Sequence, residues 1–172
     1  ATSGMPIGAA FRAAVASLRP ESGLRDEVVL TGAMPVLAAA LVRRSQGLEP
    51  VIPDETLSHA ADTLRMLRGE MASDAEASAL NAYLLTVSDH AMNASTFAGR
   101  VIASTQADLF MAVTGAYCAL TGPLHGGAPE PVLEMLDAIG MRDKIAPWID
   151  AAIARGDRLM GFGHRISRVR DP

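Results

Sequence analysis

The spacing of apolar residues constrains the fold more than any other feature of this sequence. They recur at intervals of three and four, and two clear stripes are Leu57, Ala60, Ala61, Leu64 and Leu67, and Ala77, Leu80, Leu84 and Val87. Residues so spaced share one face of an α-helix. Alternating polar and apolar runs are nearly absent, and aromatic residues make up only 4% of the chain, so few strands are expected. The sequence predicts an all-α fold.

Capping residues, glycines and prolines divide the chain into about eight predicted helices. Asp54 and Asp74 are predicted N-caps, and Gly69 is predicted to end the helix that Asp54 begins. Pro35 is expected to kink or split a long helix, because proline lacks a backbone donor and clashes with the preceding turn. The predicted helices cover residues 7–18, 25–45, 55–68, 75–92, 95–104, 106–121, 129–139 and 143–155.

The composition excludes several classes of protein. A net charge of −4 and a pI near 5.5 give no general attraction to nucleic acid or to an anionic membrane, so neither is an expected partner. The most apolar stretch, residues 109–120, is shorter than the roughly 20 residues that a membrane span needs. Cys118 is the single cysteine, and residues 1–4 lack the features of a secretory signal. The expected location is the cytoplasm.

A glycine-rich turn at 121–128 is the first large break in composition. Gly122 and Pro123 end the apolar helix predicted before it, and Pro129 suits the first turn of the next helix. A chain of 172 residues has the size of one ordinary domain or of a piece of a larger one. We expect part of a large helical unit at 1–121, a hinge loop at 122–128 and the start of a smaller unit at 129–172.

Three of the four histidines lie beside Gly, Asp or Asn rather than inside a leucine-rich stripe, and these three are candidates for function: His90, His125 and His164. His59 lies within a predicted helix and is interpreted as a surface or packing residue. No histidine or cysteine pair has the spacing of zinc ligands, and no Gly-x-Ser-x-Gly motif is present. A metal site and a serine nucleophile are therefore not expected.

His125 lies in a glycine-rich loop between a buried helix and a new helix start. A stiff backbone would fix its side chain, and small neighbours would leave room for a substrate. Helix N-termini favour a neutral imidazole, which could donate a hydrogen bond to a carbonyl that becomes an enolate. The alternative is a histidine that caps its own helix.

His164 lies in the sequence Gly-Phe-Gly-His-Arg at 161–165, which Arg168 and Arg170 follow. Exposed amides and guanidinium groups would make an anion site that fits a phosphate-bearing ligand. The alternative is a flexible surface loop with solvated arginines.

His90 lies in a dense polar cluster at 88–95, where polar groups need internal hydrogen bonds or a polar ligand. The structural alternative is a helix-to-helix junction that Asn93 or Ser95 caps, and it is compatible with a ligand role.

Three long motifs occur in order: SDHAMNASTFAGRVIASTQAD at 88–108, GPLHGGAPEPVLEM at 122–135 and RLMGFGHRISRVRDP at 158–172. Together they resemble the citrate synthase family, and weaker likeness covers nearly all of the remaining chain. The resemblance implies a helical fold with dimer-forming helices in a large domain and a small CoA-binding domain. It implies an acyltransferase of the tricarboxylic acid cycle that condenses acetyl-CoA with oxaloacetate and water to give citrate and CoA, without a cofactor.

The resemblance also implies roles for individual residues. The histidine matching His125 stabilises the enol of the acetyl thioester, the one matching His164 polarises the oxaloacetate carbonyl, and the one matching His90 binds an oxaloacetate carboxylate. Asn93 and Ser95 match positions that help to orient the His125 loop. The implied CoA-binding residues are Leu124, Leu159, Met160, Gly161, Phe162, Gly163, Arg165 and Arg168.

Two departures from the family pattern stand out. Pro129 occupies a position where asparagine is common, which suits a helix start but removes an amide side chain. The family's oxaloacetate-binding arginine and its catalytic aspartate would both fall after Pro172, and an early part of the large domain is expected before this chain. We therefore do not expect these 172 residues to turn over alone.

Family members are dimers, so the resemblance implies a homodimer whose small domain closes over the site and excludes water. The close alternative is 2-methylcitrate synthase, which uses propionyl-CoA, because one methylene discriminates only weakly. A catalytically silent paralogue that binds acyl-CoA or a carboxylate is an alternative from another class, and a helical scaffold is a further one. The three matching histidines argue against the paralogue, and the Gly-Phe-Gly-His-Arg loop argues against the scaffold.

Overall fold

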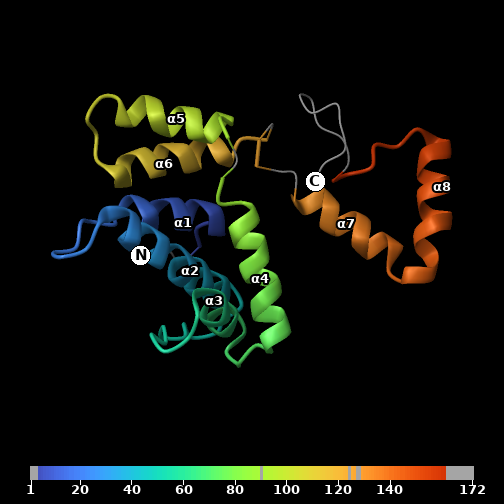
Figure 1. Cartoon of the computed structure of the whole chain (residues 1–172), viewed down its shortest axis with the longest axis horizontal. Coiled ribbons are helices and arrows are strands. Elements are labelled where there is room, and N and C mark those ends of the chain that lie inside the picture. Colours follow the sequence, from blue (N-terminus) through green and yellow to red (C-terminus); the bar gives the residue numbers. More distant parts are fainter. Residues whose placement is uncertain (1–3, 90, 124, 127–128, 162–172) are drawn as a thin grey trace. The chain divides into compact units, whose positions relative to one another are not determined.

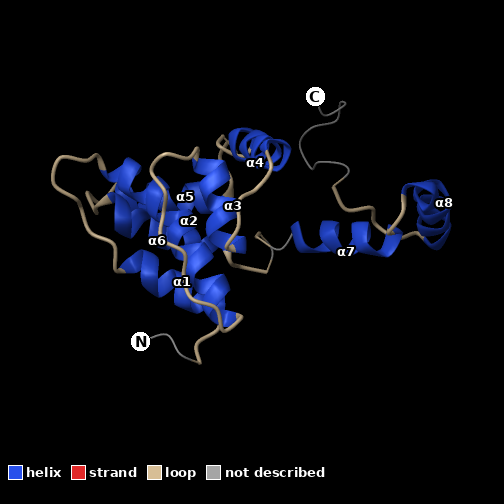
Figure 2. Cartoon of the chain, turned by 90° about the horizontal axis from the view of Figure 1, so that it is seen from below, coloured by secondary structure: helices blue, strands red, loops and turns tan. Residues whose placement is uncertain are grey.

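The computed structural model describes residues 4–89, 91–123, 125–126 and 129–161. Every regular element in these ranges is a helix, so the predicted all-α fold is confirmed (Figure 1, Figure 2). The elements are α1 (Ile7–Ala16), α2 (Asp26–Ser45), α3 (His59–Arg68), α4 (Asp74–Thr86), α5 (Ala94–Ala103), α6 (Leu109–Leu120), α7 (Pro129–Ile139), the 3-10 helix η1 (Arg142–Lys144) and α8 (Ile145–Arg155).

The chain divides into two compact units, Ala1–Ala119 and Leu120–Pro172. The first unit holds α1 to α5 and all but the last residue of α6, and the second holds α7, η1 and α8. The role of residues 122–128 as a hinge stays a prediction.

In the first unit α2 occupies the centre, since α1 and α3 both pack against it, and α4 packs against α3 (Figure 1). Helix α1 also contacts α6. The rings of Phe11 and Tyr117 lie 5.2 Å apart, and the Tyr117 hydroxyl donates to the Gly8 carbonyl at 3.4 Å. The buried apolar side chains of this unit are Ala10, Val15, Leu30, Ala39, Ala60, Met66, Phe110 and Ala112. The core therefore lies between α1, α2, α3 and α6.

Pro35 lies in the interior of α2, and the helix is continuous across it. Of the two predicted outcomes, the split is therefore wrong, and the kink stays a prediction. Proline removes one backbone donor, but packing against α1 and α3 holds the helix together. By length and composition alone α2 could cross a membrane. Its packing, with Leu30 and Ala39 buried, makes it the central helix of the first unit.

Helix α3 begins at His59, later than predicted, because Ser58 and not Asp54 is its N-cap. The Ser58 hydroxyl accepts from the Ala61 N–H at 3.3 Å. Asp54 instead forms a local turn, in which its carboxylate accepts from the Thr56 hydroxyl at 2.7 Å and from the Thr56 N–H at 3.0 Å. These two bonds hold the pKa of Asp54 below its usual range. His59 is thus the first residue of the helix rather than a mid-helix residue.

Helix α4 differs from its prediction at both ends. Ser73, not Asp74, is the N-cap, and it forms a capping box with Glu76. The helix ends at Thr86 rather than near residue 92. The Ser88 hydroxyl donates back to the last turn of α4 at 2.7 Å, which satisfies a terminal carbonyl and closes the helix. Residues 87–89 and 91–93 are therefore a connection and not part of the helix.

The other helix boundaries lie within a few residues of their predictions. Gly69 ends α3 as predicted, with a left-handed φ of 88°, and Pro129 begins α7 as predicted. Asp108 caps α6 by accepting from the Met111 N–H at 2.8 Å. The helix predicted at 143–155 starts as the single 3-10 turn η1 before α8.

Helices α5 and α6 approach each other closely at two glycines (Figure 1). A Cβ atom on Gly99 would lie 3.3 Å from the Cβ of Ala116, and a Cβ on Gly115 would overlap the side chain of Ile102. A side chain at Gly99 would press on the backbone and on Ala116 of α6, whereas one at Gly115 would displace the end of the Ile102 side chain.

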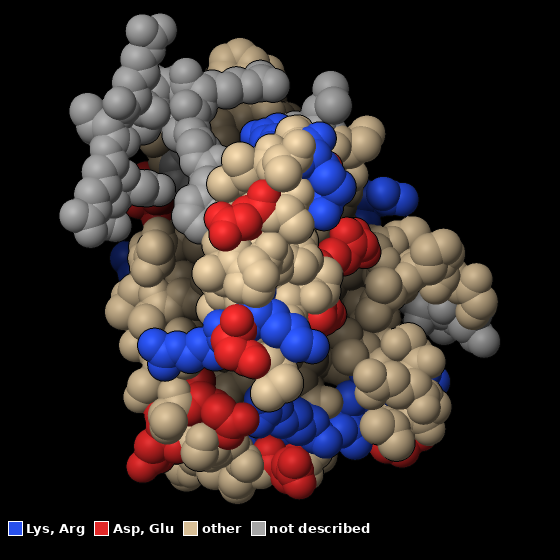
Figure 3. Space-filling view, turned by 90° about the vertical axis from the view of Figure 1, so that its right-hand side faces the viewer, with Lys and Arg blue, Asp and Glu red and all other residues tan. Residues whose placement is uncertain are grey.

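In the second unit η1 packs against α8, and Ile139 and Ala152 are buried. Helix α8 ends at Gly156, whose left-handed φ of 75° suits glycine. An apolar cavity of about 470 Å³ lies in this unit, lined by residues that include Met135, Met141, Ile145, Ile149 and Leu159. Acidic and basic side chains are intermingled on the face shown in Figure 3, so neither charge sign dominates the described part of that face.

Candidate functional site

His125 lies in a tight turn directly after α6, and its side chain is half-buried. Its backbone N–H donates to the Gly122 carbonyl at 3.0 Å, and the Gly126 N–H donates to the same oxygen at 3.3 Å. A Cβ atom on Gly126 would overlap the carbonyl oxygen of Leu120. The turn therefore folds back on the end of α6, and hydrogen bonds from the backbone of His125 and Gly126 hold it there.

Asn93 is the N-cap of α5, the helix that follows the polar cluster. Its side-chain oxygen accepts from the Thr96 N–H at 2.9 Å and from the Ser95 hydroxyl at 2.8 Å. Both Asn93 and Ser95 are half-buried. Of the two predicted caps, Asn93 and Ser95, the structure shows Asn93, and the role of both residues in orienting the His125 loop stays a prediction.

The chain between α8 and Gly161 carries three of the residues predicted to bind CoA. Leu159 and Met160 are half-buried, and Gly161 is exposed with a φ of 81°, a left-handed value that favours glycine. A Cβ on Gly161 would lie 3.9 Å from the Val132 side chain on α7, which is ordinary contact. The positive φ, rather than space, explains the glycine.

The remaining predicted site residues lie outside the described residues: His90, Leu124, Phe162, Gly163, His164, Arg165 and Arg168. Among the described ones, Asn93 and Ser95 belong to the first unit, whereas His125 and the 159–161 segment belong to the second. Their assembly into one site therefore stays a prediction.

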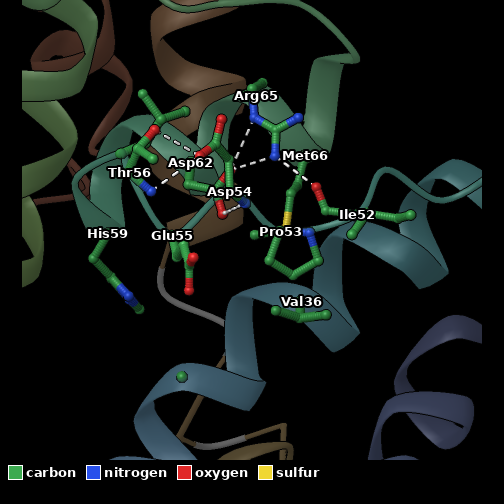
Figure 4. Close-up of a pocket in the computed structure, with 12 residues that line it drawn as sticks. Val36, Ile52, Pro53, Asp54, Glu55, Thr56, His59, Asp62, Arg65 and Met66 are labelled. Carbon is green, nitrogen blue, oxygen red and sulfur yellow. Dashed lines mark hydrogen bonds and ion pairs between the residues drawn. The ribbon is translucent and has the colours of Figure 1, made fainter.

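A hollow of about 930 Å³ in the first unit lies between α2, the loop before α3 and α3 itself (Figure 4). Four of its polar residues, Asp54, Thr56, Asp62 and Arg65, take part in hydrogen bonds or an ion pair within the lining. Arg65 lies 2.6 Å from the buried carboxylate of Asp62 and donates to the Ile52 carbonyl at 2.6 Å, while Asp62 accepts from the Asp54 N–H at 3.1 Å. These bonds fasten the loop onto α3. None of the predicted site residues lines this hollow.

Metal binding gains no support from the described residues, which contain no group of three or more His, Cys, Asp or Glu side chains that could hold an ion.

Sequence reasoning also passed over Asp89. Its carboxylate accepts from the Ala91 N–H at 3.0 Å, and it directly precedes His90 in the sequence. An Asp two residues before a position with left-handed backbone is a signal of such a turn, but the sequence does not show which residue adopts that backbone.

The described residues define an all-α protein of two compact units, with a half-buried histidine in a glycine-rich turn after α6. The family model described as citrate synthase, C-terminal domain, matches residues 3–172. The chain therefore belongs to the citrate synthase family.

Individual relatives agree with this assignment. The chain is 42% identical to citrate synthase 2 of Bacillus subtilis over 156 residues, which are 91% of this chain and 42% of that protein. It is 43% identical to a 2-methylcitrate synthase of Mycobacterium tuberculosis over 138 residues, which are 80% of this chain and 35% of that protein. The chain thus spans less than half the length of the relatives that it matches.

Solved structures show the same fold. Citrate synthase from Pyrobaculum aerophilum aligns with a TM-score of 0.75 and 34% identity, over 96% of this chain and 46% of that one. A ternary complex of citrate synthase from Thermoplasma acidophilum with carboxymethyl coenzyme A and oxaloacetate aligns with a TM-score of 0.70 and 32% identity, over 96% and 45% of the two chains.

Proposed function

We propose that the intact protein carrying this sequence is an acyltransferase that condenses acetyl-CoA with oxaloacetate and water to give citrate and CoA. The observation that carries the proposal is His125, half-buried in a turn whose next residue has no room for a side chain. A donor fixed before the substrate arrives stabilises developing charge at little reorganisation cost. Membership of the citrate synthase family supports the reaction type.

In this proposal His125 donates a hydrogen bond to the thioester oxygen of acetyl-CoA as its methyl group loses a proton and the enol forms. The enol carbon attacks the carbonyl of oxaloacetate, which His164 polarises, while His90 binds a carboxylate. Water then cleaves the thioester of citryl-CoA. The proton-abstracting aspartate is expected in the intact protein after Pro172.

Asn93 and Ser95 would orient the His125 turn, and no cofactor would be needed. The residues proposed to bind CoA are Leu124, Leu159, Met160, Gly161, Phe162, Gly163, Arg165 and Arg168. Bacterial and archaeal relatives support a cytoplasmic location.

The protein is further proposed to act as a homodimer that pairs through α5 and α6. Phe97 and Met111 are 61% and 60% exposed, and Val101 is 49% exposed on the same pair of helices. Phe97 and Val101 lie four residues apart and so share one face of α5, and an exposed apolar face of this kind supports an interaction site.

A second candidate activity is the same condensation with propionyl-CoA. Citrate synthases and 2-methylcitrate synthases match this chain at almost equal identity, 42% and 43%. One methylene is worth only about 1–3 kcal/mol of discrimination, so both acyl-CoA substrates deserve testing.

The test is oxaloacetate-dependent release of the CoA thiol by the intact protein, with acetyl-CoA and propionyl-CoA in parallel. Release from acetyl-CoA at the higher kcat/KM supports the leading proposal, and a preference for propionyl-CoA supports the second. No release from either substrate would reject both and leave a silent acyl-CoA-binding paralogue.

A further inference from the structure

The second unit has very little core of its own. Ile139 and Ala152 are its buried apolar residues among those that the structure describes. Helix α8 packs against η1, whereas contact between α7 and α8 is slight. Large apolar side chains stay exposed on both helices, and Leu136 and Ile153 are 54% and 60% exposed. A unit with so few buried side chains needs further apolar contacts to fold, because ordering each residue costs conformational entropy.

The place where these contacts are missing is the apolar cavity of about 470 Å³ in this unit. Met135 and Ile139 line it from one stripe of α7, and Ile145 and Ile149 line it from one stripe of α8. Such stripes pack against other helices. A site for a small ligand would also carry several polar groups that fix the ligand's orientation, whereas Arg142 is the one charged residue in this lining. The cavity therefore fits apolar side chains of polypeptide.

We infer that polypeptide following residue 172 in the intact protein covers this cavity and completes the core of the second unit. The chain spans less than half the length of the relatives that it matches, so intact members of the family contain the additional polypeptide that this requires. A segment of the same polypeptide is present at a high effective concentration, and consecutive elements usually lie side by side. A second copy, in contrast, would have to bind a unit that still lacks its core.

The cover also reaches the segment proposed to bind CoA, a consequence that rests on the proposed function. Leu159 is half-buried and lines the cavity, and Met160 and Gly161 follow it directly. Apolar side chains seated in the cavity pack against Leu159, so they fix the position at which this segment begins.

Labelling of introduced cysteines with a maleimide, in the intact protein, tests whether the cavity is covered. Leu136 lines the cavity, whereas Glu134 is exposed on the acidic face of α7 that Glu130 and Asp137 share. We expect Leu136→Cys to react about tenfold or more slowly than Glu134→Cys in the native protein, because a covered thiol reacts only after local opening. Each rate is divided by the rate in denaturant, and mass spectrometry of the labelled peptides separates these thiols from Cys118. Equal native rates would overturn the inference.

Photocrosslinking identifies the polypeptide that covers the cavity. Met141 lines the cavity and is 62% exposed, so Met141→p-benzoylphenylalanine places a photoreactive group at its edge. We expect crosslinks within one molecule to peptides that follow residue 172. Crosslinks to a second molecule, or only to residues 1–172, would overturn the inference, and this readout also decides the matter if Leu136→Cys fails to fold. Neither readout depends on turnover, so a protein that releases no CoA would reject the proposed function and leave the cover in place.

Discussion

The half-buried His125 is the residue on which the proposed chemistry most depends, and a single substitution tests it. His125→Ala should lower kcat by about 10²–10³-fold, as loss of one donor to an enolate or oxyanion typically does. Far-UV circular dichroism should keep its helical signal. His59→Ala is the matched control, since His59 is exposed at the start of α3 and should leave kcat unchanged. A large loss of helicity in His125→Ala would instead indicate a structural role.

For individual residues, the sequence pointed to the tight turn at His125 but did not predict which residues cap the helices. Glycines on either side of His125 signalled a tight turn, and the structure shows one. Asp54 and Asp74 are predicted helix caps, but Ser58 and Ser73 cap these helices instead. Asp and Ser both favour such positions, so composition alone could not separate them, although Glu76 three residues after Ser73 was a readable capping-box signal.

Between elements, close packing of α5 on α6 makes Gly115 sensitive to substitution. Gly115→Ala would force the end of the Ile102 side chain out of its present rotamer, and we expect it to lower the free energy of unfolding by about 0.5–1.5 kcal/mol. Gly32→Ala on α2 is the control, because its Cβ meets no other atom within 4 Å and better helix propensity should stabilise by about 0.5–1 kcal/mol. Chemical denaturation measures both, and equal effects would contradict the close packing.

The capping box of α4 predicts a specific dependence on acid. Bonds from the Ser73 hydroxyl and N–H, and then from Arg68, lower the pKa of Glu76 from 4.5 to about 2. A carboxylate with a depressed pKa in the folded state stabilises the fold above pH 4.5, and this stabilisation is lost as the pH falls towards 2. Glu76→Gln should therefore make the free energy of unfolding less dependent on pH over this interval. Ser73→Ala should reduce this dependence partly. An unaltered slope in Glu76→Gln would show that the box has no such effect.

Helix number and order could be read from the apolar stripes, but the end of α4 could not. No glycine or proline marks that end, and residues 87–93 contain apolar residues compatible with a continued helix. Hydrogen bonds between side chains and the backbone set the connection instead. The Ser88 hydroxyl donates to the last turn of α4, and the Asp89 carboxylate accepts from the Ala91 N–H. Such local competition with helical hydrogen bonds is hard to rank from one sequence.

For the whole molecule, the proposed pairing through α5 and α6 gives a matched experiment. Phe97→Asp should weaken the dimer by about 2 kcal/mol or more, roughly 30-fold in Kd, because it places a charge at a buried aromatic contact. Met71→Asp is the control: Met71 is also 61% exposed but lies between α3 and α4. Sedimentation velocity should show monomer only for Phe97→Asp, and dimer in both variants would place the interface elsewhere.

The close packing at Gly126 limits which substitutions the gene can carry at that codon. The Leu120 carbonyl oxygen occupies the space that a side chain at Gly126 would need. Every missense change at that codon therefore introduces a collision beside the candidate histidine. In a saturation-mutagenesis library selected for growth, codon 126 should tolerate only synonymous changes, whereas codon 32, which faces open space, should accept many residues. The backbone of this turn would then limit which variants of the gene remain functional.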